Sequence, residues 1–203
     1  MKVRKILKRA WMRFWASVSL WLLATSVIGV AAGGPAESKS YPRRNETILA
    51  RISPGRTSMA TAQALWRNPT KNDEQNHSAI WQSCDGDALN VNFSDEGIIQ
   101  SVWLSKTKAR PLRACANAVA MAPKFSTGMG LRLGDAASRV LQLYGEPDSR
   151  SPSTKDQQRL ELLYYAFDWA GPDVPQMMEV LCTVEKDGKA GRVIEITLSA
   201  SSL

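Results

Sequence analysis

The sequence predicts an α+β fold built from two tandem repeats, each a short helix followed by a three-stranded antiparallel meander. Three observations lead to this class: a capped helix pattern occurs twice, an aromatic strand pattern follows each copy, and a strand–turn–strand pattern follows that. One such repeat is too small to bury its own apolar face. Two repeats side by side can form one sheet covered by helices on one face.

The predicted organisation divides the chain into five segments. They are a signal peptide or N-terminal membrane anchor (residues 1–32), a linker (33–50), the first repeat (51–108), a connector with a short helix (109–127) and the second repeat (128–203). The linker is assigned because glycine, proline, serine and charged residues occur there without a period.

The N-terminus has the order of an export signal. Residues 1–13 carry six basic and no acidic side chains, and residues 14–32 are uncharged. Val30 and Ala32 stand where a signal peptidase would read, which predicts cleavage after Ala32. The uncharged stretch also approaches the roughly 20 residues that a helix needs to cross a bilayer. The alternatives are therefore a cleaved signal, a retained inner-membrane anchor or a buried soluble helix, and the first two place residues 34–203 outside the cytoplasm, periplasmic or secreted after cleavage.

The charge balance changes when that basic region is set aside. The whole chain has a net charge of +7, but six of its 26 basic residues precede residue 14, which leaves 20 basic and 19 acidic residues. A net charge of +1 removes the main support for binding to nucleic acid. The expected partner is another envelope or secreted protein, and membrane contact is expected only through residues 14–32 if they are retained.

The capped helix pattern occurs at residues 56–70 and again at 133–149. In the second copy Asp135 is expected to cap the first amides, and Gly145 with the nearby proline is expected to end the helix. The positions between them have the spacing of one apolar helical stripe: Ala137, Val140, Leu141 and Tyr144. The first copy repeats the cap, the stripe and the stop, with Thr57 in the place of Asp135.

Each helix is followed by the same succession of strand patterns, separated by turn sequences. The predicted strands are 78–84, 88–93 and 98–105 in the first repeat, and 162–169, 177–184 and 192–199 in the second. Between the repeats, two prolines bracket a short helix predicted within residues 110–123.

These motifs are similar to those of a known family. The lead-in "GLRLGD", the helix ending in "LYGEP" and the final strand "VIEITL" resemble beta-lactamase-inhibitor-like modules, including the small outer-membrane assembly lipoproteins of the SmpA/OmlA (BamE) type. The likeness covers residues 52–200 as two copies and is strongest over 128–147. It implies a non-enzymatic extracytoplasmic module that binds other proteins across a sheet surface. No cysteine follows the apolar segment, so the lipid anchor of the assembly lipoproteins is not implied.

The three cysteines, Cys84, Cys115 and Cys182, allow one disulfide in an oxidising compartment. We expect Cys84 to pair with Cys115, because Cys182 alternates with apolar residues as a buried core residue would. His77 is the single histidine of the chain, which excludes a Cys/His zinc site of normal spacing.

Other patterns do not make a convincing cofactor or catalytic site. The glycines of residues 128–134 lack the dinucleotide-binding spacing, and Asp85 with Asp87 offers too few ligands for calcium. A catalytic pair formed by Asp168 and Glu179 across adjacent strands is the remaining enzymatic alternative. The sequence therefore predicts no enzyme activity, no cofactor and no metal.

Aromatic residues on the strands are the better functional candidates, because tryptophan and tyrosine dominate protein interfaces. The candidate partner-binding residues are Trp81, Trp103, Tyr164 and Trp169. Tyr164 and Tyr165 are neighbours in a strand, so one of them must face away from the helices. If Trp81 and Trp103 point to that same side, the aromatics form a binding patch. The alternatives are ordinary packing and a structural or assembly role in the envelope.

Overall fold

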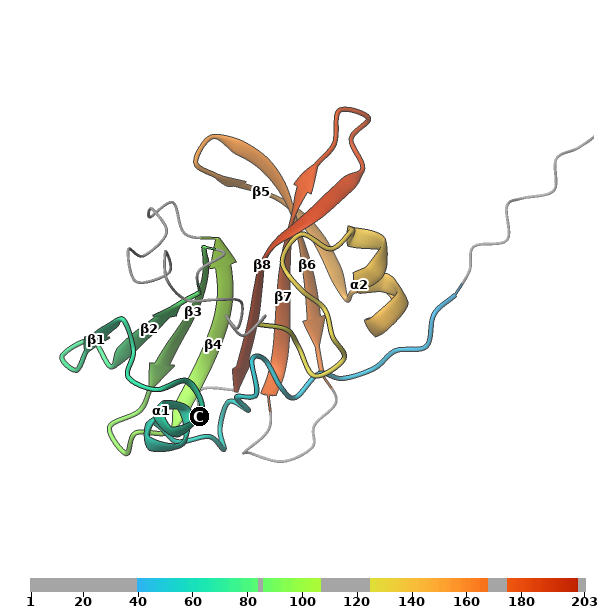
Figure 1. The fold of residues 1–203 in the computed structure, drawn as a ribbon. Helices are drawn as coiled ribbons and strands as arrows, with labels where there is room; N and C mark the ends of the chain where they lie inside the picture. Colours follow the sequence, from blue (N-terminus) through green and yellow to red (C-terminus); the bar gives the residue numbers. More distant parts are fainter. Residues whose placement is uncertain (1–39, 84–85, 107–124, 168–174, 201–203) are drawn as a thin grey trace, which may run out of the picture. The chain divides into compact units, whose positions relative to one another are not determined.

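The structure, a computed structural model, describes residues 40–83, 86–106, 125–167 and 175–200 (Figure 1). The described residues belong to one compact unit. Several predictions lie outside the described residues: the signal or anchor, the connector helix, the Cys84–Cys115 disulfide, Trp169 and Asp168. No helix within the described ranges is long and apolar enough to span a membrane.

The described chain runs twice through one helix and four strands. The first succession is α1 (Met59–Trp66), β1 (Lys71–Asp73), β2 (Ser78–Gln82), β3 (Asp87–Phe93) and β4 (Ile99–Lys106). The second is α2 (Ala137–Tyr144), β5 (Ser149–Lys155), β6 (Gln158–Ala166), β7 (Pro175–Val184) and β8 (Ala190–Ala200). All eight strands belong to one antiparallel sheet in the order β1-β2-β3-β4-β8-β7-β6-β5.

The last strands of the two successions join the sheet in its middle. β4 and β8 pair antiparallel, with Trp103 opposite Thr197 and Leu104 opposite Ile196. Among the described strands this is the single pairing between the first four and the last four. Hydrogen bonding is therefore continuous from β1 to β5.

The predicted α+β class, with helices covering one face of the sheet, is wrong, because the protein is β-rich. The two helices have eight residues each, so each is about 12 Å long, whereas eight strands span about 34 Å. Two short helices cannot cover such a sheet, and residues 40–58 and 125–136 also pack on that face (Figure 1). The predicted three-stranded meanders each have four strands. The additional strands, β1 and β5, were not predicted because they are polar and have no apolar alternation.

Both predicted helix caps are also wrong. The N-cap of α1 is Ser58, whose side chain accepts a hydrogen bond from the Thr61 amide, and the N-cap of α2 is Ala136, which makes no side-chain cap. Thr57 instead accepts from the Ser53 amide at 2.9 Å. Asp135 accepts from the amide three residues before it at 2.9 Å. Each predicted cap therefore closes the turn that leads into its helix.

The core lies on the helix side of the sheet. Its central row crosses the strands from β3 to β6, and every member is at most 1% exposed: Leu89, Leu104, Ile196, Val180 and Leu163. Tyr144 from α2 and Tyr165 from β6 meet edge to face, with ring centroids 6.1 Å apart. Trp66 of α1 is half-buried, packs against the core and meets Phe125 edge to face.

Residues 40–48 form a strap that lies against the C-terminal end of α2. Glu46 is 3% exposed, and its carboxylate accepts four hydrogen bonds. The donors are the amides of the next two residues, the Met129 amide at 3.0 Å and the Tyr144 hydroxyl at 2.8 Å. A buried carboxylate is tolerated only when its oxygens are satisfied in this way. The strap, which the sequence assigned to the linker, therefore contributes a buried polar centre to the domain.

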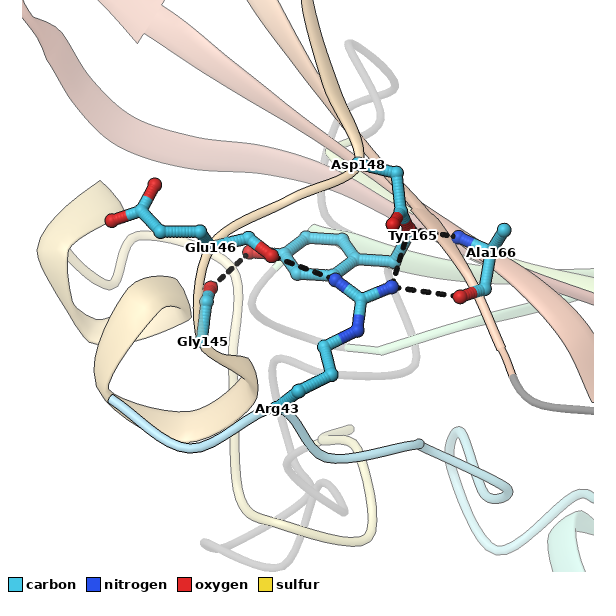
Figure 2. Close-up of polar contacts among 6 residues, drawn as sticks. All are labelled: Arg43, Gly145, Glu146, Asp148, Tyr165 and Ala166. Atoms are coloured by element: carbon cyan, nitrogen blue, oxygen red, sulfur yellow. Dashed lines mark hydrogen bonds and ion pairs between the residues drawn. The ribbon is translucent and has the colours of Figure 1, made fainter. Parts of the chain in front are cut away.

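Arg43 fastens the same strap to β6 and to the segment between α2 and β5 (Figure 2). Its guanidinium donates to the carbonyl oxygens of Glu146 and Ala166, each at 2.7 Å, and pairs with the Asp148 carboxylate. It also lies over the Tyr165 ring, 4.7 Å from the centroid. Burial alone would raise the pKa of Asp148. Hydrogen bonds from the Ala166 amide and from Arg43 outweigh this effect and hold the pKa of Asp148 below its usual value.

Gly145 ends α2 where the strap passes. Its φ of 76° lies in the left-handed region, which favours glycine. A Cβ at this position would meet the carbonyl oxygen of Tyr41 at 3.0 Å and that of Pro42 at 3.1 Å. Glycine is therefore required here for the close approach of the strap as well as for the end of the helix.

Cys182 is a free and fully buried thiol in β7. Burial raises its pKa to about 12, and the nearby Glu161 carboxylate adds to the shift. Since the thiolate is the reactive form, we expect Cys182 in the folded protein to resist iodoacetamide at pH values of about 8, and to react once guanidinium chloride unfolds the chain. Peptide mass mapping of the labelled protein measures the extent of labelling at Cys182 separately from the other cysteines. Equal labelling rates in the folded and unfolded states would contradict the buried position.

Candidate binding face

The second face of the sheet, called here the outer face, carries the side chains that alternate with the core. Its central row crosses five strand pairings, and its members are Ile80, Asn90, Trp103, Thr197, Glu179 and Tyr164. Asn90 is 8% exposed, and the other five are half-buried. Both described helices pack on the opposite face, in the core.

Trp103 and Tyr164 share this row although they are distant in sequence. Between them lie Thr197 of β8 and Glu179 of β7. Three strand spacings place their backbones about 14 Å apart. The pairing of β4 with β8 therefore brings one aromatic residue from each half of the chain to the same surface.

Trp81, the third described candidate, is not part of that surface. It lies opposite Leu89 in the register, on the core face, and is 4% exposed. Its indole Nε1 donates to the Arg67 carbonyl oxygen at 2.9 Å. The condition that Trp81 and Trp103 point to the same side is not met, because their positions in the paired strands have opposite parity. Of the two adjacent tyrosines, Tyr164 faces outward and Tyr165 lies in the core.

The outer face is hollowed beside the Thr197–Glu179 pair. The hollow has a volume of about 190 Å³, and its lining comes from four strands: Ser153, Leu162, Glu179, Leu181, Glu195 and Thr197. Lys155 at the end of β5 pairs with Glu195 of β8, although β6 and β7 lie between these strands in the sheet. The β5–β6 hairpin therefore bends across the sheet toward β8 (Figure 1). Ser153 and Leu162 of this hairpin line the hollow, which is called here the outer-face pocket.

The two carboxylates of the outer-face pocket differ in their surroundings. Glu195 is engaged by Lys155. The carboxylate of Glu179 makes no hydrogen bond or ion pair within the part of the chain that the structure describes. The sequence singled out Glu179 but paired it with Asp168, which lies outside the described residues. Glu195 was missed, because a polar residue in an alternating strand carries no signal of its neighbours across the sheet.

A second hollow lies on the core side, between α2 and the β5–β6 and β7–β8 hairpins. It has a volume of about 390 Å³, and its walls include Leu141, Leu163, Arg150 and Glu161. Arg150 pairs with Glu146 at 2.8 Å, so its charge already has a partner. Trp103 and Tyr164 lie on the other face of the sheet, so this groove is a weaker candidate for binding a protein.

The sheet edges are poor sites for adding a strand from a partner. β1 has three residues, and β5 carries Pro152 in its middle. Short strands and prolines at an edge oppose pairing with another chain. Among the described residues no group of three metal-ligating side chains could hold a metal ion. The outer face is therefore the surface with the clearest capacity for recognition.

No protein-family model and no curated protein match the sequence. Two solved structures are similar in part. YjgB, a DUF4309 family protein from Bacillus subtilis subsp. subtilis str. 168, is 11% identical with a TM-score of 0.41, over 74% of this chain and 82% of its own. A cysteine-rich secretory protein from Staphylococcus aureus subsp. aureus Mu50 is 9% identical with a TM-score of 0.34, over 71% of this chain and 44% of its own. At these scores neither likeness assigns a function to the chain.

Proposed function

We propose that the protein is a non-enzymatic, extracytoplasmic binding module whose outer face holds another envelope or secreted protein. The observation that carries the proposal is the placement of Trp103 and Tyr164 in one row of that face, on either side of the Thr197–Glu179 pair that lines a hollow. Large aromatic side chains beside a pocket are typical anchors of protein interfaces. The edge strands do not offer an alternative surface.

A small carboxylate-based enzyme is the second candidate, because Glu179 and Glu195 line one pocket. General acid–base catalysis requires catalytic groups within reach of the substrate. Glu195 is instead occupied by its ion pair with Lys155. Binding is therefore the function with the better support.

The test is a pull-down from envelope extract with the tagged full chain, beside a Trp103→Ala variant. Loss of an anchor residue at an interface costs about 2 kcal/mol or more, so we expect captured partner to fall at least about tenfold. Ile48→Ala is the matched control, because Ile48 is an exposed apolar residue of the strap, 40% accessible, and lies off the outer face. Circular dichroism establishes that both variants are folded.

A specific partner must then bind the purified protein saturably. Equal capture by the wild-type and Trp103→Ala chains would show that the partner binds somewhere other than the outer face. Capture of no partner by either chain would contradict the binding function itself.

A further inference from the structure

We propose that the outer-face pocket receives a cationic side chain, lysine or arginine, of the bound protein. This inference rests on the proposed function and specifies the partner chemistry at the same face. It is carried by three features of the pocket: a carboxylate in the same row as aromatic side chains, an ammonium group of the chain that already occupies the other carboxylate, and the size of the hollow.

The first feature is a carboxylate between aromatic side chains. Glu179 stands next to Tyr164 in the central row, and Thr197 stands between Glu179 and Trp103. A cation seated at Glu179 would meet the negative charge of this carboxylate beside Tyr164, its direct cross-strand neighbour in β6. Both interactions favour a cation, and their sum is larger than either alone at a partly desolvated site.

The second feature is the ammonium group that the protein already brings to this place. Lys155 crosses two strands to pair with Glu195. The pocket therefore holds one cation from the chain itself at Glu195, and Glu179 on the neighbouring strand is left without an ion-pair partner among the described residues. This leaves one carboxylate for a cation supplied from outside.

The third feature is size. The hollow of about 190 Å³ is below the roughly 300–1,000 Å³ of sites for drug-sized molecules. Leu162 and Leu181 form part of its wall, and such walls suit the methylene stem of a lysine or arginine. The dimensions therefore fit one inserted side chain better than an independent small ligand.

The experiment titrates the full chain in non-ionic detergent with three capped peptides, Gly-Lys-Gly, Gly-Arg-Gly and Gly-norleucine-Gly, followed by two-dimensional NMR. Norleucine keeps the stem of lysine and lacks the ammonium group. We expect the lysine and arginine peptides to bind about tenfold more tightly than the norleucine peptide. The shifted resonances should be those of Glu179, Thr197 and their strand neighbours, and added salt should reduce the preference.

Two variants test the assignment to Glu179. Glu179→Gln should reduce the cation preference to about twofold or less. Glu161→Gln is the matched control, since Glu161 is another half-buried carboxylate that lies in the neighbouring strand and lines the groove on the opposite side; it should keep the full preference. Lys155→Ala should strengthen binding of the lysine peptide, because it removes the internal competitor from Glu195.

Equal affinities for the lysine and norleucine peptides would overturn the inference, as would shifts confined to the groove beside Glu161 or weaker binding by Lys155→Ala. The proposed function is tested separately by Trp103→Ala. A partner that is lost with Trp103→Ala but retained with Glu179→Gln would leave the binding module in place and reject the cationic contact alone.

Discussion

Replacing Glu46 by alanine is expected to lower the free energy of unfolding by about 3–4 kcal/mol. The carboxylate is almost fully buried and accepts four hydrogen bonds. Alanine would leave the Met129 amide without its acceptor in the interior, and the Tyr144 hydroxyl would keep only the Thr127 hydroxyl as a partner. Hydrogen bonds to charged groups are worth more than neutral ones, and an orphaned buried donor costs the full desolvation of that group.

Urea unfolding of the full chain, followed by circular dichroism, measures this loss. Glu185→Ala, an exposed carboxylate in the β7–β8 turn, is the control and should change stability by less than about 0.5 kcal/mol. Glu46→Gln is also expected to destabilise, because its amide NH₂ would face donors. A loss below about 1 kcal/mol for Glu46→Ala would show that the strap is not part of the cooperatively folding unit.

The second large effect is expected at the join between β4 and β8. Ile196→Ala should cost about 3–4 kcal/mol, the usual range for truncating a fully buried isoleucine or leucine. Ile196 is 0% exposed and stands directly opposite Leu104, which is also 0% exposed. The cavity would open in the middle of the core, where neighbouring strands on both sides prevent collapse.

Thr197→Ala is the matched control for this site. Thr197 is the next residue in β8 and faces the outer side, so its truncation should cost less than about 1 kcal/mol. Both variants are measured by thermal and urea unfolding. If Ile196→Ala produced two separate transitions, the two four-stranded halves would be independent folding units, contrary to a core shared through β4 and β8.

Local features of this chain were readable from its residues. The positions of both helices follow from their apolar stripes and stops, and six strands lie where alternation predicts them. The buried position of Cys182 follows from its apolar alternation in β7. β1 and β5 were missed, because an edge strand is exposed on one side and its residues need no apolar period. The helix caps were each misplaced by one residue, since a polar side chain beside a helix can equally close the preceding turn.

The sequence by itself determined which segments form helices and strands and which residues within a strand share a face, because these depend on local periods of 3.6 and 2 residues. Only the tertiary structure decided which face each strand turns to the core, since that depends on register between distant strands. It placed Trp103 with Tyr164 and separated both from Trp81. It also joined β4 to β8, brought Lys155 to Glu195 and buried Glu46 beside Tyr144. These contacts join residues that are far apart in the chain, so no local sequence pattern predicts them.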